Sequence, residues 1–240
     1  MSMKLIRGFY MTFELYLLSF GLVALCALFV GLFLDAFYRG RYVKALALKG
    51  VASLAFLGLG AITCLVGNGG REAVLVFVGL CLGVVGDEVI ALCQVFPERD
   101  SLAFIGGGSF FLVGHIFYIV ALFSVAAVSI PAIAICFAIA VALSLIYNKM
   151  RGFLVGEMKI PLALYLGIVT FVGALAFGLF VKRLSIGAAI FTLGGILFTV
   201  SDNILFAYKL GKKPLFRQNI ALHVVYYLAQ IFIAWSVLWI

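Results

Sequence analysis

Long apolar runs dominate this sequence of 240 residues. Each run has about the 20 residues that a helix needs to cross the hydrocarbon core of a bilayer, and short polar segments separate the runs. We place eight spans near residues 10–32, 43–66, 73–96, 102–125, 127–147, 160–180, 186–208 and 219–240. The runs are continuous and do not alternate between polar and apolar residues, which excludes an outer-membrane β-barrel. The sequence therefore predicts an all-α, polytopic helical bundle, with residues 1–240 forming a single transmembrane domain.

Charged residues make up 11% of the chain, whereas a soluble domain has about 25%. So few charges cannot cover a water-exposed surface, which excludes a soluble enzyme domain, a secreted disulfide scaffold and a disordered chain. The formal net charge of +8 arises from Lys and Arg in short loops between the apolar runs. Cations at such positions orient membrane helices, so we expect membrane lipids and no nucleic acid as partners.

The distribution of Lys and Arg over the loops predicts the orientation of the chain. Five of these residues fall on one face of the membrane: Lys4, Arg7, Arg71, Lys182 and Arg183. The remaining twelve fall on the opposite face, which we therefore expect to be cytoplasmic. With eight spans, both termini are then expected on the non-cytoplasmic side. Short tails and the lack of an organelle signal favour a bacterial inner membrane.

Polar side chains within the spans carry the information about function. An ionisable group in hydrocarbon costs at least about 2.5–3.5 kcal/mol, so it usually faces a cavity or a partner and marks a functional site. Asp87 and Asp202 are the two carboxyl groups of most interest. The other polar candidates inside the spans are Lys49, Glu88, His115, Tyr118, Ser201, Asn203, His223, Tyr226, Tyr227 and Gln230.

The predicted topology allows Asp87 and Asp202 to meet. Their helices run in the same direction, and both residues precede the end of their span by a similar number of residues. At 1.5 Å per residue, the two carboxyl groups lie at similar depth from one face. Lys49 enters from that face at similar depth. We therefore expect these side chains to line one pocket that opens toward the cytoplasmic side.

A weak internal repeat supports this arrangement. Residues 79–87 resemble residues 194–202 at an offset of 115, and the same offset places His115 opposite Gln230. The offset predicts two four-helix halves related by a parallel repeat. Such halves bring both acids toward their shared interface.

Four segments, in this order and spacing, resemble a known family. They read GLCLGVVGD from Gly79, FIGGGSFFLVGHIFY from Phe104, GAAIFTLGGILFTVSDNILF from Gly187 and YYLAQ from Tyr226. Together they are similar to the YhhN family of lysoplasmalogenase-like membrane proteins, along the whole predicted bundle. Two positions depart from the family pattern, because Gly50 follows Lys49 where Pro is usual and Glu88 stands where an apolar residue is usual.

The resemblance implies hydrolysis of the vinyl ether bond of lysoplasmalogens, with Asp87 and Asp202 as the catalytic acids and no cofactor or metal. The substrate is then a lysophospholipid taken from the bilayer. The products are a fatty aldehyde and glycerophosphoethanolamine or glycerophosphocholine.

The chemistry of the bond suits two carboxyl groups. Protonation of the β-carbon gives an oxocarbenium ion, which water attacks, and glycosidases meet a related ion with two carboxyl groups. Two close acids in a low-dielectric site hold one proton between them at neutral pH. Residues expected to orient the substrate or water are Lys49, His115, Tyr118, Ser201, Asn203, His223, Tyr226 and Gln230.

Other interpretations remain open. His115 and His223 with one of the two Asp residues match the donor set of a metal-dependent membrane hydrolase. Intramembrane carboxylates and an internal repeat also suit a proton-coupled carrier. A purely structural role is the third alternative, in which Asp87 bonds a neighbouring helix and Glu88 pairs with Lys49 or Arg99.

Overall fold

A computed structural model gives the three-dimensional structure of the chain. It describes residues 3–67, 70–125, 159–210 and 215–239, together with residues 134, 137, 138, 141, 142, 145 and 146. Most of the predicted span 127–147 and nearly all of the loop 148–159 lie outside the described residues, as do the predicted loop cations Lys149, Arg151, Lys212 and Lys213.

Long helices make up the described part of the chain, which contains no strand. Their bounds are Met3–Tyr38 for α1, Tyr42–Val66 for α2, Arg71–Val95 for α3, Asp100–Val125 for α4, Lys159–Arg183 for α6, Ile186–Leu210 for α7 and Phe216–Ser236 for α8. Short 3-10 helices at Pro97–Arg99 and Val237–Trp239 precede α4 and follow α8. Seven candidate spans in the described residues are long and apolar enough to cross a membrane. The predicted all-α membrane class is confirmed, while the eighth span and the two four-helix halves stay predictions.

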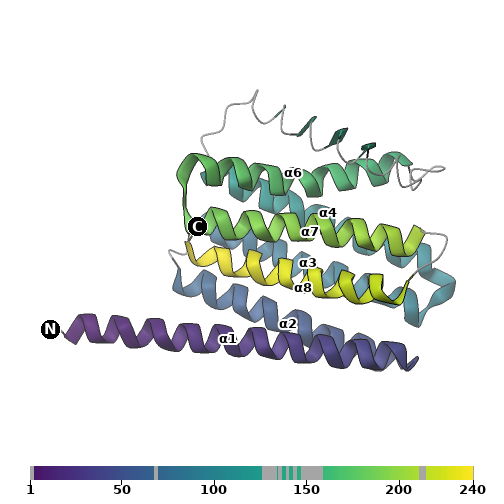
Figure 1. Cartoon of the computed structure of the whole chain (residues 1–240), viewed down its shortest axis with the longest axis horizontal. Helices are drawn as coiled ribbons and strands as arrows, with labels where there is room; N and C mark the ends of the chain where they lie inside the picture. The colour runs from purple at the N-terminus through teal and green to yellow at the C-terminus, as the bar shows by residue number, and fades with distance from the viewer. Residues whose placement is uncertain are drawn as a thin grey trace.

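The helices lie side by side and alternate in direction along each described hairpin (Figure 1). As a result α3 and α7 run in the same direction, as the topology requires for the two acids. α1 begins and α8 ends at the same end of the bundle (Figure 1). Both chain ends therefore lie on one side, although which side faces the cytoplasm remains a prediction.

Helix ends follow local backbone chemistry. After α1, Gly40 adopts a left-handed φ of 71°, a conformation that glycine reaches without steric cost. The N–H of Gly40 donates to the Phe37 carbonyl oxygen and that of Arg41 to the Ala36 carbonyl oxygen, which is the Schellman arrangement. α3 ends just before Pro97, because proline lacks the N–H that a continuing helix needs.

Glycines allow α3 and α4 to approach closely. A Cβ atom on Gly86 would lie 2.8 Å from the Gly107 carbonyl oxygen, and one on Gly107 would lie 2.6 Å from the Gly86 carbonyl oxygen. On the same face, Gly79 leaves room for the ring of Tyr118. In lipid, where the hydrophobic effect does not drive helix association, such backbone contact is a main source of packing energy. The glycine pattern thus fixes the position of α3, the helix that carries Asp87.

We expect Gly107→Ala to destabilise the protein by about 1–3 kcal/mol, because the new methyl group has no space beside the α3 backbone. Gly106→Ala is the matched control. Its Cβ would meet only Val89, at an ordinary 3.5 Å. Unfolding of both variants in one detergent measures the difference, and equal stability would contradict the proposed close contact.

Candidate active site

A buried ion pair joins α2 to α3. Lys49 and Asp87 are 3% and 6% exposed, and the Nζ of Lys49 lies 2.8 Å from the Oδ1 of Asp87. The same ammonium group donates to the Asp87 carbonyl oxygen at 2.9 Å. Two charges taken out of water together need such close geometry, because the desolvation of each is unfavourable. Lys49 therefore neutralises Asp87 within the bundle.

Hydroxyl groups complete the surroundings of Asp87. Ser53 on α2 donates to the Oδ2 of Asp87 at 3.0 Å, and the hydroxyl of Tyr227 on α8 lies 3.3 Å from the same oxygen. Ser53 and Tyr227 also lie within hydrogen-bond distance of each other, at 3.1 Å. Asp87 thus contacts one cation and two hydroxyls that come from two other helices.

Asp202 on α7 has a different environment. It is 3% exposed, and its Oδ2 accepts a hydrogen bond of 2.7 Å from the hydroxyl of Tyr165 on α6. Among the described residues, no cation forms an ion pair with this carboxyl group. The two acids therefore differ in kind, because one faces an ammonium group and the other a neutral phenol.

The two acids occupy matching positions in two helical hairpins. Asp87 lies eight residues before the end of α3 at Val95, and Asp202 lies eight residues before the end of α7 at Leu210. Each acid bonds a side chain of the preceding helix, Lys49 and Ser53 in one hairpin and Tyr165 in the other. Within the described part of the chain, no hydrogen bond links one acid directly to the other.

Tyr226 and Gln230 of α8 lie against α3 at Gly83, one helical turn before Asp87. The Nε2 of Gln230 donates to the hydroxyl of Tyr226 at 3.1 Å, and that hydroxyl lies 3.5 Å from the carbonyl oxygen of Gly83. The Oε1 of Gln230 is buried with no hydrogen-bond partner among the described residues. A buried amide oxygen in this state is costly, so it is a natural acceptor for water or a substrate hydroxyl.

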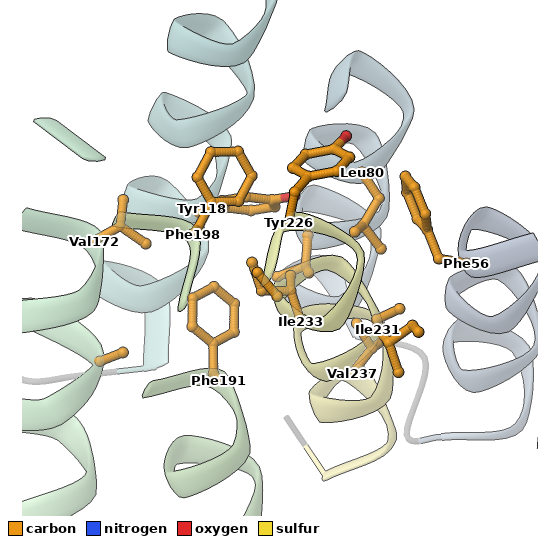
Figure 2. Packing of buried hydrophobic residues seen from close by; sticks show 14 of the residues in the cluster. Phe56, Leu80, Tyr118, Val172, Phe191, Phe198, Tyr226, Ile231, Ile233 and Val237 are labelled. Carbon is orange, nitrogen blue, oxygen red and sulfur yellow. The ribbon is translucent and has the colours of Figure 1, made fainter. Parts of the chain in front are cut away.

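An aromatic layer lies between the helices of the two acids. Figure 2 shows Tyr118, Phe198 and Tyr226 close together, from α4, α7 and α8. The ring of His115 packs against Phe198 at 4.5 Å and Tyr118 at 5.5 Å between centroids. His115 and Tyr118, both predicted site residues, are thus part of this apolar packing.

Several predicted site residues bond their own helix. Ser201 donates to the Phe198 carbonyl oxygen at 2.8 Å, and Asn203 donates to the Thr199 carbonyl oxygen at 2.7 Å. The Nδ1 atoms of His115 and His223 each lie 2.8 Å from the backbone carbonyl oxygen four residues earlier. Both Nδ1 atoms therefore donate, which leaves the Nε2 atom of each ring as the one that can accept a proton.

A cavity of about 50 Å³ opens among α1, α2, α3, α7 and α8, and we call it the polar cavity for the polar groups in its otherwise largely apolar wall. By volume it holds on the order of three or four water molecules. Lys49 and His223 are the predicted site residues that line it, and Gln94, Lys209 and Asn219 add further polar groups. Its described lining contains two Lys and no Asp or Glu. Because each lysine also pairs with a carboxylate outside this lining, Asp87 or Asp100, the cavity is suited to water and to the polar groups of a ligand.

An apolar groove of about 150 Å³ lies among α3, α4, α6 and α7. Phe104 and Gly108 of α4 face Leu162 and Tyr165 of α6 across it. Tyr165 connects the groove to Asp202, because its ring lines the groove while its hydroxyl bonds the carboxyl group. An apolar space with a buried acid behind one wall is suited to a hydrocarbon chain that carries a reactive group.

Glu88 does not pair with Lys49, one of the two cations that the sequence offered as its partner, because Lys49 bonds Asp87. The Oε1 of Glu88 is buried without a hydrogen-bond partner in the described part of the chain. Its carboxyl group lies against Gly50, where a Cβ atom would be 3.6 Å away. The two departures from the family pattern are therefore neighbours in space.

The described side chains do not gather the donors of the metal-dependent alternative. Among them, no group of three His, Cys, Asp or Glu is placed to hold a metal ion. His115 packs in the aromatic layer, whereas His223 lines the polar cavity and packs against Phe33 at 4.8 Å. The two rings thus have separate surroundings.

Sequence reasoning missed Ser53 and Tyr165, and it named Tyr227 as a polar residue of its span without assigning it to the site. Ser53 follows Lys49 by four residues, a spacing that places both on one helix face, so this signal was available. Tyr227 follows His223 by the same spacing. Tyr165 lies in a span without a charged side chain, and only its distance from the α6–α7 turn relates it to Asp202.

Comparisons with known proteins yield one match, to a family model. No curated protein and no solved structure is significantly similar to the chain. A family model described as the YhhN family matches residues 44–237, which include both acids and all of their partners. Because this match covers far more than half of the sequence and nearly all of α2 to α8, the chain belongs to the YhhN family.

Proposed function

We propose that this protein hydrolyses the vinyl ether bond of lysoplasmalogens within the membrane. The observation that supports it most is the pair of buried acids, Asp87 beside an ammonium group and Asp202 beside a phenol, in a chain of the YhhN family. Acid-catalysed cleavage of a vinyl ether needs one acid that gives a proton and one carboxylate that stabilises a cation.

The different surroundings suggest which acid has which role. Asp202, buried without a cation among the described residues, is suited to hold a proton and to act as the general acid. Asp87 forms an ion pair with Lys49, so it is suited to stabilise positive charge and to accept a proton from water. Two titratable groups whose environments favour opposite protonation states are the usual sign of such a division.

The reaction then proceeds in balanced steps. Asp202 transfers its proton to the β-carbon of the vinyl ether, and the electron pair of the ether oxygen forms the C=O⁺ bond of an oxocarbenium ion. Water attacks the cationic carbon and passes a proton to Asp87, which leaves a hemiacetal. The hemiacetal hydroxyl gives its proton to Asp202 as the C–O bond to glycerol breaks. Asp87 passes its proton to the glycerol oxygen, so both acids return to their starting states. The sum is one vinyl ether and one water converted to one aldehyde and one alcohol.

Release of aldehyde from lysoplasmenylethanolamine by the purified protein tests the proposal. We expect aldehyde and glycerophosphoethanolamine in equal amounts, and no product from the saturated alkyl ether analogue, which lacks the double bond. Absence of aldehyde from every vinyl ether lipid would contradict the proposal. Transport of the lipid across liposomes without any product would favour the carrier instead.

We expect Tyr165→Phe to slow aldehyde release by about tenfold, the equivalent of one lost hydrogen bond of about 1.4 kcal/mol. The substitution removes the donor to Asp202 and leaves the ring in the groove wall, so the fold is retained. Tyr16→Phe removes a hydroxyl from an exposed tyrosine of α1 that lines neither space and serves as the control. A rate unchanged in Tyr165→Phe would show that this hydrogen bond does not position the acid.

A further inference from the structure

The polar cavity and the apolar groove meet at two side chains. Ile90 of α3 and Leu205 of α7 are the residues that line both spaces. The two spaces therefore adjoin at the Ile90–Leu205 pair, and one molecule that occupies both has to pass over it.

This junction lies one helical turn from each candidate catalytic acid. Ile90 follows Asp87 by three residues on α3, and Leu205 follows Asp202 by three residues on α7. Residues three apart on a helix lie on the same face. Both acids therefore lie next to the boundary between the polar and the apolar space, Asp87 on α3 and Asp202 on α7.

The chemistry of the two spaces is complementary to an amphiphile. Lys49 and Lys209 are the charged groups among the described residues of the cavity wall. Lys209 lies at the outer part of the cavity, where it forms an ion pair with Asp100. The groove beyond the junction has almost entirely apolar walls, and Ser109 and Tyr165 are the lining residues that carry a polar group. Exposed residues of α4 and α6, Ile105 and Pro161, line its outer part. A hydrocarbon chain can thus enter from the bilayer between α4 and α6.

Gly108 is the position that leaves the groove open. It lines the groove, and no neighbouring atom lies within 4 Å of the place that its Cβ would take. Gly107, the preceding residue, is in tight contact with α3, so the open space is specific to the groove side of α4. A Cβ atom at 108 would therefore meet no other residue, and a larger side chain would take up room in the groove.

We propose that a single-chain phospholipid binds across the Ile90–Leu205 pair, with its hydrocarbon chain in the α4–α6 groove and its phosphate facing Lys209, and that Gly108 determines the room for the chain. The placement rests on the proposed function in one respect, since it brings the bond between chain and glycerol next to Asp87 and Asp202. Binding itself does not depend on that reaction.

Binding of a tritiated saturated 1-O-alkyl lysophosphatidylethanolamine to the full chain in nanodiscs tests the chain subsite. We expect Gly108→Leu to weaken binding by about tenfold, the effect of excluding about two methylene groups. Gly108→Ala is expected to give an intermediate loss. Gly178→Leu, at an exposed glycine of α6 that also has no neighbour within 4 Å, is expected to bind like the wild type. Wild-type affinity in a folded Gly108→Leu protein would overturn the proposal.

The phosphate contact has its own test. We expect Lys209→Gln to weaken binding of the lysolipid by about fivefold and to leave binding of a 1-O-alkylglycerol unchanged, because that lipid has no phosphate for the lysine to attract. Equal losses for both lipids would overturn the assignment of Lys209. Binding that responds to Gly108 without any aldehyde release from the vinyl ether lipid contradicts only the proposed reaction. Aldehyde release that ignores Gly108 contradicts only the chain subsite.

Discussion

Asp202→Asn is expected to lower aldehyde release by a factor of about 10²–10⁴, the usual contribution of a general acid. Asparagine has nearly the same shape, and its amide oxygen still accepts the hydrogen bond from Tyr165, so the bundle is expected to keep its stability. What is lost is the proton that the vinyl ether has to receive. Initial rates of aldehyde formation by wild type and variant, at equal amounts of folded protein, measure the effect.

The matched control is Asp35→Asn, which makes the same chemical change at an exposed carboxylate paired with Arg39 at the end of α1. This variant is expected to retain the wild-type rate. An Asp202→Asn protein that is folded and fully active would remove Asp202 from the mechanism while leaving the hydrolase activity to be explained by other groups.

Lys49→Met is expected to destabilise the protein by about 3–5 kcal/mol, because it leaves the Asp87 carboxylate buried without its cation. The methionine fills much of the space of the lysine, so the loss reports the missing charge more than a cavity. Thermal unfolding in one detergent is the measurement. In the double variant Lys49→Met/Asp87→Asn we expect most of the stability to return, since the neutral amide still accepts hydrogen bonds from Ser53 and Tyr227.

Lys209→Met is the comparison for the ion pair. Lys209 pairs with Asp100, whose side chain is 45% exposed, so water stabilises the remaining charge and the expected loss is at most about 1 kcal/mol. Equal losses for the two lysine variants would show that burial of the Lys49–Asp87 pair does not determine stability.

Hydropathy predicted the helices well where lipid surrounds them. The predicted spans 43–66 and 186–208 became Tyr42–Val66 and Ile186–Leu210. The largest difference is at α1, which begins at Met3 while the predicted span begins at residue 10. A hydropathy run marks the part of a helix within the hydrocarbon, whereas the helical hydrogen bonds continue past it.

Side-chain partners were harder to predict than helix positions. The sequence marks Lys49 and Asp87 as ionisable groups at similar depth, but it does not say that they bond each other while Glu88 remains without that partner. The choice depends on the rotation of α2 and α3 about their axes, and the close packing of Gly86 on Gly107 of α4 fixes that of α3 alone. Tyr165 was missed because a phenol in an apolar span is usually a packing residue.

The Lys49–Asp87 pair also bears on how the chain enters the membrane. A lone lysine or aspartate near the middle of a span makes insertion of that helix unfavourable by about 2.5–3.5 kcal/mol. Here the opposite charges lie on consecutive helices, with α2 ending at Val66 and α3 beginning at Arg71. Inserted together as a hairpin, the two segments offset the charges of Lys49 and Asp87, which leaves Glu88, whose Oε1 is buried, as the remaining acid of this part of α3. We therefore expect α2 and α3 to leave the translocon as one piece.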